Sequence, residues 1–210
     1  MITTTQIIAR QGWFGAGLLG VGLVASLALG FGTGILLFFI ALLLWLYMFR
    51  NPERLSNSIE PNAFVAPIDG IVRDIISSKN QITILVETRF FDVGVIRAPY
   101  EIAQGSVSYT HGLSLSCAHK AKQDALNASM RFESVAGREF RLEFAPVIFS
   151  SHTIFTHSNL GVGERMGFMK AGMTRIVVPW DSKKGELELK VSIGDKLCAL
   201  QSVIGYFHEV

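Results

Sequence analysis

One stretch near the N-terminus limits what this chain can fold into more than any other feature. Between Arg10 and Arg50 lie 39 consecutive residues without Asp, Glu, Lys or Arg, rich in Leu, Gly, Phe and Ala. As one helix at about 1.5 Å per residue, this run would reach roughly 58 Å, nearly twice a hydrocarbon core of about 30 Å. The glycines in the Gly30–Gly34 segment favour a break there. The sequence therefore predicts a membrane hairpin over residues 1–50, with short apolar helices at about 12–29 and 35–48.

The orientation of this hairpin follows from its flanking charges. In a hairpin both ends lie on the same side of the membrane, and Arg10, Arg50 and Arg54 flank these ends. The positive-inside rule then predicts an inner-membrane protein whose remaining chain is cytoplasmic. The second helix is short for a full crossing, so a re-entrant hairpin is an open alternative. A cleaved signal peptide is disfavoured, because the run is too long and no small-residue cleavage site follows it.

The composition changes abruptly after the hairpin. Residues 51–62 form a polar connector with two prolines, and residues 63–210 are enough for one domain with its own core. Short β-branched or alternating runs, such as 82–88 and 138–146, predict strands separated by glycine turns. One possible helix covers about 118–130. The predicted fold class is therefore mainly β, a compact barrel-like or sandwich domain preceded by an α-helical transmembrane hairpin.

Composition also disfavours several classes of function. The formal net charge is only +2 and no Lys/Arg-rich run occurs, so we expect no nucleic-acid partner. Cys117 and Cys198 are far apart and fit incidental thiols of a reducing compartment better than a disulfide. No metal site is expected, because the five histidines lack ligand spacing. These histidines are His111, His119, His152, His157 and His208.

Four segments occur in an order that is typical of one enzyme family. They are FRNPER (Phe49–Arg54), APIDGIV (Ala66–Val72), FDVGVIRAP (Phe91–Pro99) and GERMGFMKAGMTRIVVP (Gly163–Pro179). Together with the tail from Val191 to Phe207, they resemble the short, membrane-associated branch of the phosphatidylserine decarboxylases. The resemblance runs from about Phe49 to the C-terminus and implies a decarboxylase-type domain.

The resemblance implies an unusual chemistry. In that family a serine attacks the carbonyl of the preceding glycine, and cleavage of the chain leaves a pyruvoyl group that accepts electrons from the substrate. Gly172 and Met173 stand at the family cleavage site. The thioether of Met173 has no proton to give, no nucleophilic oxygen and no leaving group, so no pyruvoyl cofactor is expected. Thr174 is the nearest hydroxyl, but in a strand its side chain faces the opposite way.

The resemblance assigns roles to further positions. Asp69 is retained where the family has a carboxylate that assists self-cleavage, although an Asp-Gly turn explains it equally well. Gly94 stands where the family has a histidine, and glycine offers no proton relay. Arg97 is a candidate for binding a substrate phosphate or carboxylate, with a structural ion pair as the alternative. His152 and Thr174 are the other candidates for substrate contact.

These departures favour a non-catalytic relative that is anchored in the membrane and acts in phospholipid metabolism. Residues 120–132 and 149–155 also depart from the polar segments of the family. The expected partners are a serine or anionic phospholipid, a membrane enzyme or a second copy of the chain. The alternative is an active decarboxylase that converts phosphatidylserine, or a related serine phospholipid, to phosphatidylethanolamine by an atypical mechanism. A third alternative is a biotin- or lipoate-like carrier that uses Lys170.

Overall fold

The computed structural model describes most of the chain and divides it into two compact units. The described residues are 7–55, 60–113, 129–134, 138–148, 153–154, 159–179 and 187–208. The first unit is Met1–Glu53 and the second is Arg54–Val210.

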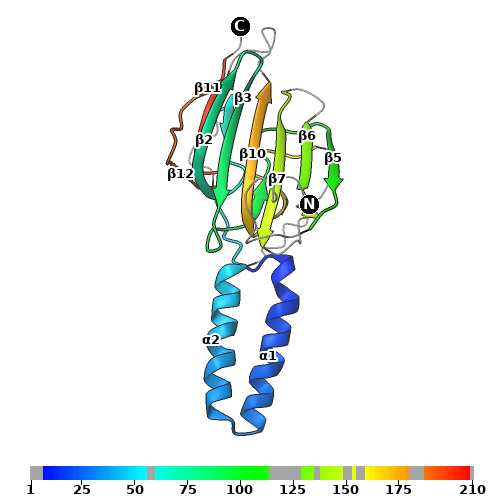
Figure 1. Cartoon of the computed structure of the whole chain (residues 1–210), viewed down its shortest axis with the longest axis vertical. Helices are drawn as coiled ribbons and strands as arrows, with labels where there is room; N and C mark the ends of the chain where they lie inside the picture. The colour runs from blue at the N-terminus through cyan, green and yellow to red at the C-terminus, as the bar shows by residue number, and fades with distance from the viewer. Residues whose placement is uncertain are drawn as a thin grey trace. The chain divides into compact units, whose positions relative to one another are not determined.

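The first unit contains two apolar helices that lie side by side (Figure 1). A 3-10 turn, η1 (Arg10–Gly12), leads into α1 (Trp13–Ala28), and α2 covers Gly32–Met48. The chain reverses at Gly30, whose φ of +67° suits glycine and ends α1. By length and composition, the segment Arg10–Ala28 could cross a membrane, whereas Gly32–Met48 is apolar but shorter.

Aromatic side chains of α2 pack into glycine notches on α1. A Cβ atom added at Gly15 would come closer than 3.0 Å to the ring of Trp45, and one at Gly22 would meet the ring of Phe38 in the same way. The Trp45 indole also donates a hydrogen bond to the carbonyl of Gly12 at 2.8 Å. The glycines of α1 therefore allow a close contact between the helices that larger residues would prevent.

The second unit is mainly β, which confirms the predicted fold class. Its described strands form a seven-stranded sheet in the order β12-β2-β3-β10-β7-β6-β5 (Figure 1). They also form two three-stranded sheets, β1-β13-β11 and β4-β9-β8. The described strands do not close into a barrel. The large sheet contains β2 (Gly70–Ser78), β3 (Gln81–Thr88), β5 (Gly105–Thr110), β6 (Ser129–Ser134), β7 (Arg141–Ile148), β10 (Ala171–Pro179) and β12 (Lys196–Leu197). The smaller sheets contain β1 (Ala63–Val65), β11 (Leu187–Leu189) and β13 (Val203–Phe207), and β4 (Val95–Arg97), β8 (Thr153–Ile154) and β9 (Arg165–Phe168).

The helix predicted over residues 118–130 lies mostly outside the described residues. Its last two residues, Ser129 and Met130, begin β6 instead, and there the prediction is wrong. Met130 is buried and pairs with Phe144 of β7, so tertiary strand pairing decides the conformation at this point.

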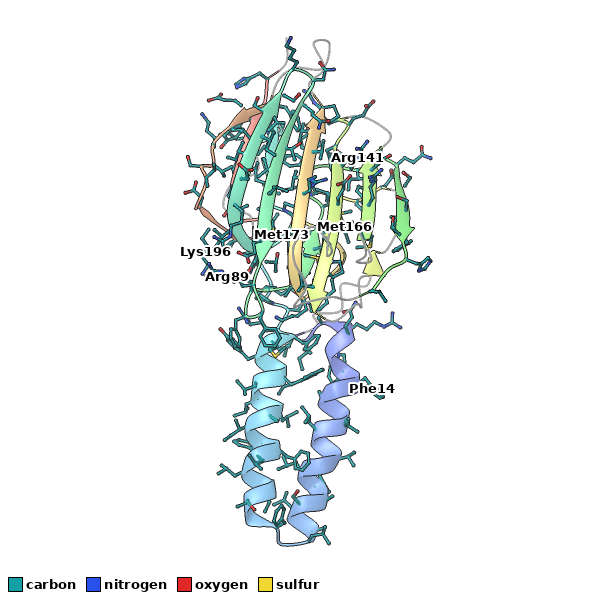
Figure 2. The ribbon with its side chains drawn as sticks, viewed as in Figure 1. Phe14, Arg89, Arg141, Met166, Met173 and Lys196 are labelled. Atoms are coloured by element: carbon teal, nitrogen blue, oxygen red, sulfur yellow. The ribbon has the colours of Figure 1, made fainter. Side chains whose placement is uncertain are left out.

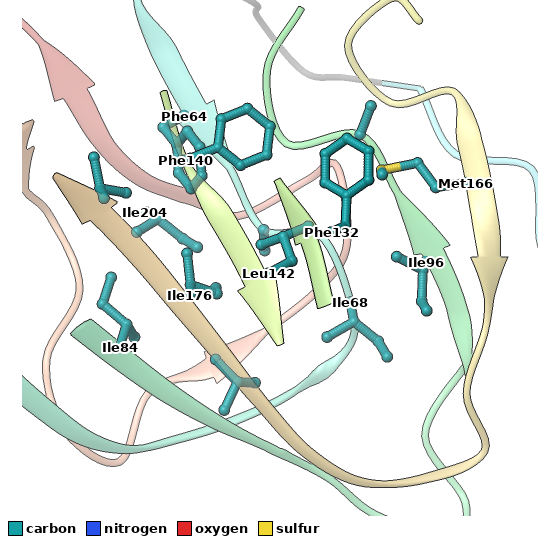
Figure 3. Close-up of a cluster of buried hydrophobic side chains, with 14 of the residues drawn as sticks. Phe64, Ile68, Ile84, Ile96, Phe132, Phe140, Leu142, Met166, Ile176 and Ile204 are labelled. Atoms are coloured by element: carbon teal, nitrogen blue, oxygen red, sulfur yellow. The ribbon is translucent and has the colours of Figure 1, made fainter. Parts of the chain in front are cut away.

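One hydrophobic core joins the three sheets. Phe64 of β1, Ile176 of β10 and Met166 of β9 all belong to the same buried cluster (Figure 3). The rings of Phe64 and Phe140 meet edge-on, with their centroids 5.4 Å apart. Because the core covers one face of β10, successive residues of this strand alternate between the core and the opposite face.

Candidate functional site

The candidate site lies on β10, in the middle of the large sheet. Gly172 pairs with Thr88 of β3, Met173 pairs with Glu87 of β3, and both residues also pair with β7 on the other side. The peptide bond between Gly172 and Met173 therefore lies at the end of the ladder with β3 and next to a register shift in the ladder with β7. β10 runs without interruption from Ala171 to Pro179.

Gly172 has a structural reason to be glycine. Its φ is +156°, and a Cβ atom added there would come closer than 3.0 Å to the main-chain carbonyl of Ala145. The pairing with β7 also shifts register between Ala171 and Gly172. A side chain at this position would strain the backbone and displace β7, so glycine is required here even without self-cleavage.

Met173, which is labelled in Figure 2, and Thr174 face opposite sides of the sheet, because burial alternates along β10. Met173 is half-buried on the face that also carries Arg175, whereas Thr174 is completely buried in the core. The hydroxyl of Thr174 has no hydrogen-bond partner among the residues that the structure describes. Thr174 is therefore adjacent to the cleavage position in sequence, but its hydroxyl is on the other side of the strand.

Asp69 is held by a buried ion pair just before β2. Nη2 of Arg54 donates to Oδ2 of Asp69 at 2.6 Å, and Nη1 donates to Oδ1. The amide of Ala199 also donates to Oδ1, at 2.8 Å. The side chains of Arg54 and Asp69 are only 10% and 11% exposed. The hydrogen bond to Asp69 raises the pKa of Arg54, so the guanidinium stays charged and Asp69 serves as its counter-ion.

A short chain of contacts connects Asp69 to Gly172. The hydroxyl of Thr88 donates to the main-chain carbonyl of Asp69 at 2.7 Å, and Thr88 pairs with Gly172 across the sheet. The structure thus brings the retained aspartate close to Gly172 and Met173. Sequence reasoning did not assign Arg54 to this site, although it lies in one of the ordered segments, and Asp69 lies in the next.

Gly94 lies where the chain leaves no space for a side chain. A Cβ atom added at Gly94 would come closer than 3.0 Å to the main-chain carbonyl of Met169. The amide of Met169 donates to the carbonyl of Gly94 at 2.8 Å, which fixes the two segments against each other. A histidine at this position would require the backbone before β10 to move.

Arg97 and His152 are two further residues that the sequence predicts to contact a substrate. Arg97 is buried in β4, and its Nη1 donates to the main-chain carbonyl of Gly163 at 3.0 Å. Its role in binding a phosphate or carboxylate stays a prediction. His152 lies outside the described residues, so the structure does not place it.

Lys170 is buried beside the same segments. Its side chain has no exposed surface, and its Nζ donates to the main-chain carbonyl of Asp92 at 3.0 Å. A lysine that carries biotin or lipoate must be exposed, both for attachment and for movement of the attached group. The carrier alternative is therefore wrong for this fold. Within the described part of the chain, no group of three His, Cys, Asp or Glu residues could hold a metal ion.

Comparison with known proteins identifies the family. No family model matches this chain, and no solved structure matches it. Several similar curated proteins are named phosphatidylserine decarboxylase proenzyme. The one from Nitrosomonas eutropha is 30% identical over 213 residues, which cover 96% of this chain and 95% of the relative. Those from Burkholderia cenocepacia strain HI2424 and Burkholderia vietnamiensis are 28% and 27% identical over 215 residues, and cover 97% of both chains. This chain therefore belongs to the phosphatidylserine decarboxylase family.

Proposed function

We propose that this protein is a membrane-anchored, non-catalytic phosphatidylserine decarboxylase homologue that remains a single uncleaved chain. In this role it binds a serine or anionic phospholipid, or a membrane-bound partner, without removing carbon dioxide. The observation that carries the proposal is Met173 at the cleavage position, inside an unbroken strand.

The chemistry of self-cleavage explains why Met173 matters. The reaction needs a side-chain nucleophile that first attacks the Gly172 carbonyl and then leaves by elimination. A thioether does neither, because its sulfur carries no proton and its Cβ carries no leaving group. Thr174 does not substitute, since its hydroxyl is buried on the opposite face.

Two further features support an inactive site. A histidine is absent at position 94, and the carbonyl of Met169 occupies the space beside Gly94 that a side chain would need. The carboxylate of Asp69 accepts hydrogen bonds from Arg54 and from the amide of Ala199. With its acceptor sites used in this way, Asp69 is better suited to stabilising the fold than to moving a proton.

The hairpin supports anchoring in a membrane. Large apolar side chains on both helices are exposed to the surroundings, for example those of Leu18, Val21 and Leu37. Trp13 and Tyr47 are exposed near the charged ends of the hairpin, as interfacial aromatic residues are. The positive-inside rule then favours a cytoplasmic location for the β domain.

Retained catalysis is the competing function. The similarity to proteins named as proenzymes covers nearly the whole chain, which favours a shared activity. An active enzyme would need an electron sink other than a pyruvoyl group at position 173. Among the described residues of the cleavage-site strand, no side chain offers a clear replacement.

Intact mass and lipid turnover test the proposal together. The full chain is purified from membranes in detergent, with the Nitrosomonas eutropha relative as the positive control. We expect a single species near 23.1 kDa and no phosphatidylethanolamine from phosphatidylserine. Two fragments separated between residues 172 and 173, or decarboxylation above that of a heat-denatured sample, would reject the non-catalytic function.

Lipid binding is measured separately on the intact chain. Titration of the detergent-solubilised protein with short-chain phosphatidylserine, phosphatidylethanolamine and phosphatidylcholine compares headgroups without changing the anchor. Preferential binding of phosphatidylserine supports a lipid-binding role. Equal binding of the three lipids would favour a protein partner instead.

A further inference from the structure

The geometry of the hairpin points to how deeply it enters the membrane. We propose that it crosses the whole hydrocarbon core and turns at the opposite headgroup boundary, instead of turning back inside the core. This inference rests on the membrane anchoring within the proposed function, but it does not depend on whether the β domain is catalytic.

Hydrogen bonds close the hairpin at its open end. The amide of Ala9 donates to the carbonyl of Phe49 at 2.8 Å, and the amide of Asn51 donates to the carbonyl of Ile7 at 2.8 Å. An antiparallel bridge between Ile8 and Arg50 lies between these bonds. The chain therefore enters and leaves the hairpin at the same end.

The cations of the hairpin also lie at this end. Arg10 precedes α1, and the guanidinium of Arg50 lies 4.2 Å from the centre of the Tyr47 ring. No charged residue occurs between Arg10 and Arg50. Moving the turn across a membrane would therefore bury no charge.

The length of the hairpin matches the hydrocarbon core. The 16 residues of α1 rise about 24 Å, and the two uncharged residues of η1, Gln11 and Gly12, add about 4 Å. The total is close to a core of about 30 Å. The 17 residues of α2 rise about 26 Å, a shortfall of a few ångströms that local thinning of the bilayer accommodates. When the charged end lies at one boundary, the turn reaches the other.

The backbone of the turn needs polar surroundings. Carbonyl groups at the end of α1 have hydrogen-bond donors: the amide of Gly30 donates to the carbonyl of Leu27, and the amide of Phe31 donates to that of Ser26. The start of α2 is different. Among the residues that the structure describes, none accepts a hydrogen bond from the amides of residues 32–34, and Phe31 before them provides no side-chain cap.

The exposed amides of Gly32 and Thr33 decide between the two depths. An unsatisfied N–H group is strongly unfavourable inside hydrocarbon, where no water is available. At the headgroup boundary, water and lipid oxygens accept the same hydrogen bonds. Thr33 and Gly32 are exposed at the turn, so such acceptors can reach them. A turn in the middle of the bilayer would leave these exposed donors without partners.

Cysteine labelling in sealed vesicles tests this depth. Both native cysteines, Cys117 and Cys198, are first replaced by serine, and single cysteines are then introduced in the full chain. Thr33→Cys reports on the turn, Leu55→Cys on the domain side and Val21→Cys on the middle of α1. Leu55 and Val21 are exposed in the structure, at 85% and 68%. A membrane-impermeant maleimide is added to right-side-out and inverted vesicles, with and without detergent.

We expect Thr33→Cys and Leu55→Cys to react from opposite faces of the membrane, and Val21→Cys to react only in detergent. Labelling of Thr33→Cys only in detergent would overturn the proposal in favour of a re-entrant hairpin. Labelling of Thr33→Cys and Leu55→Cys from the same face would overturn it as well. Gly32→Cys is a second reporter, since a Cβ atom there has no neighbour within 4 Å. None of these labelling results depends on lipid turnover. The decarboxylation assay therefore tests the proposed non-catalytic function independently of the depth of the hairpin.

Discussion

Replacing Arg54 by methionine tests the role assigned to the buried ion pair. The substitution keeps an unbranched side chain of similar length but removes the cation that faces Asp69. Among the described residues, the carboxylate would then keep only the amide of Ala199 as a donor. The carboxylate would lose its cation in a site where its side chain is 11% exposed.

The magnitude follows from burial and from the number of lost hydrogen bonds. Breaking a buried ion pair by removing one partner costs about 3–5 kcal/mol. Because both side chains retain about a tenth of their exposure, we expect a loss of about 2–4 kcal/mol in the free energy of unfolding. For a protein of this size, this corresponds to a fall in Tm of about 5–15 °C.

The pKa shift of Arg54 sets the pH range of this effect. Because the pKa is raised in the folded state, the ion pair stabilises the protein fully below the ordinary pKa of arginine. This stabilisation is lost only when the pH rises through the raised value. Both values lie above the pH range of ordinary assays. The difference between the wild type and Arg54→Met should therefore persist throughout the neutral and mildly alkaline range.

The assay is thermal unfolding of the full chain in detergent, followed by the β-sheet circular dichroism signal. Arg73→Met is the matched control, because Arg73 pairs with Glu87 but their side chains are 47% and 36% exposed. An exposed pair contributes less than about 1 kcal/mol, so the control should have a small effect. If Arg54→Met lowered Tm no more than Arg73→Met, the assignment of Asp69 to a structural role would be refuted.

Three further predictions test other parts of the structure. Gly94→Ala should lower the free energy of unfolding by about 1–3 kcal/mol, because its Cβ atom meets a main-chain carbonyl; urea unfolding should show no comparable loss for Gly17→Ala, which has open space. Thr174→Val should be neutral or stabilising by about 1 kcal/mol, since it removes a buried hydroxyl without a partner; a loss above that in urea unfolding would contradict this. The hydrogen bond from Lys190 lowers the pKa of Glu188, so its small stabilisation should be present above the ordinary pKa and lost as the pH falls through the lowered value; an unshifted carboxyl titration by NMR would argue against the pair.

Local sequence patterns predicted the kinds of structure in this chain. The uncharged run and the glycines near residue 30 predicted apolar helices and a break, because both signals act within a few neighbouring residues. The ordered segments predicted the family, which the similarity to named proenzymes confirms. Alternation also predicted that Thr174 faces away from position 173, and the burial of β10 agrees.

Other features depended on contacts between residues far apart in sequence. The pairing of Arg54 with Asp69 and Ala199 joins three separate segments, and no local pattern indicates that the carboxylate accepts a guanidinium. The predicted helix before β6 ends in a strand, because pairing with β7 outweighs local preference. The burial of Lys170, which excluded the carrier alternative, likewise depends on packing against the Asp92 segment.

The sequence by itself determined that position 173 lacks a nucleophile and that position 94 lacks a histidine, because these are properties of the side chains alone. Only the tertiary structure decided that Gly172 must stay glycine and that Gly94 has no space for a replacement. The reason is that available space around a Cα atom is set by neighbouring strands and loops, which the chain brings together from distant positions. The residue types therefore set which chemical groups are present, and packing sets the space around them.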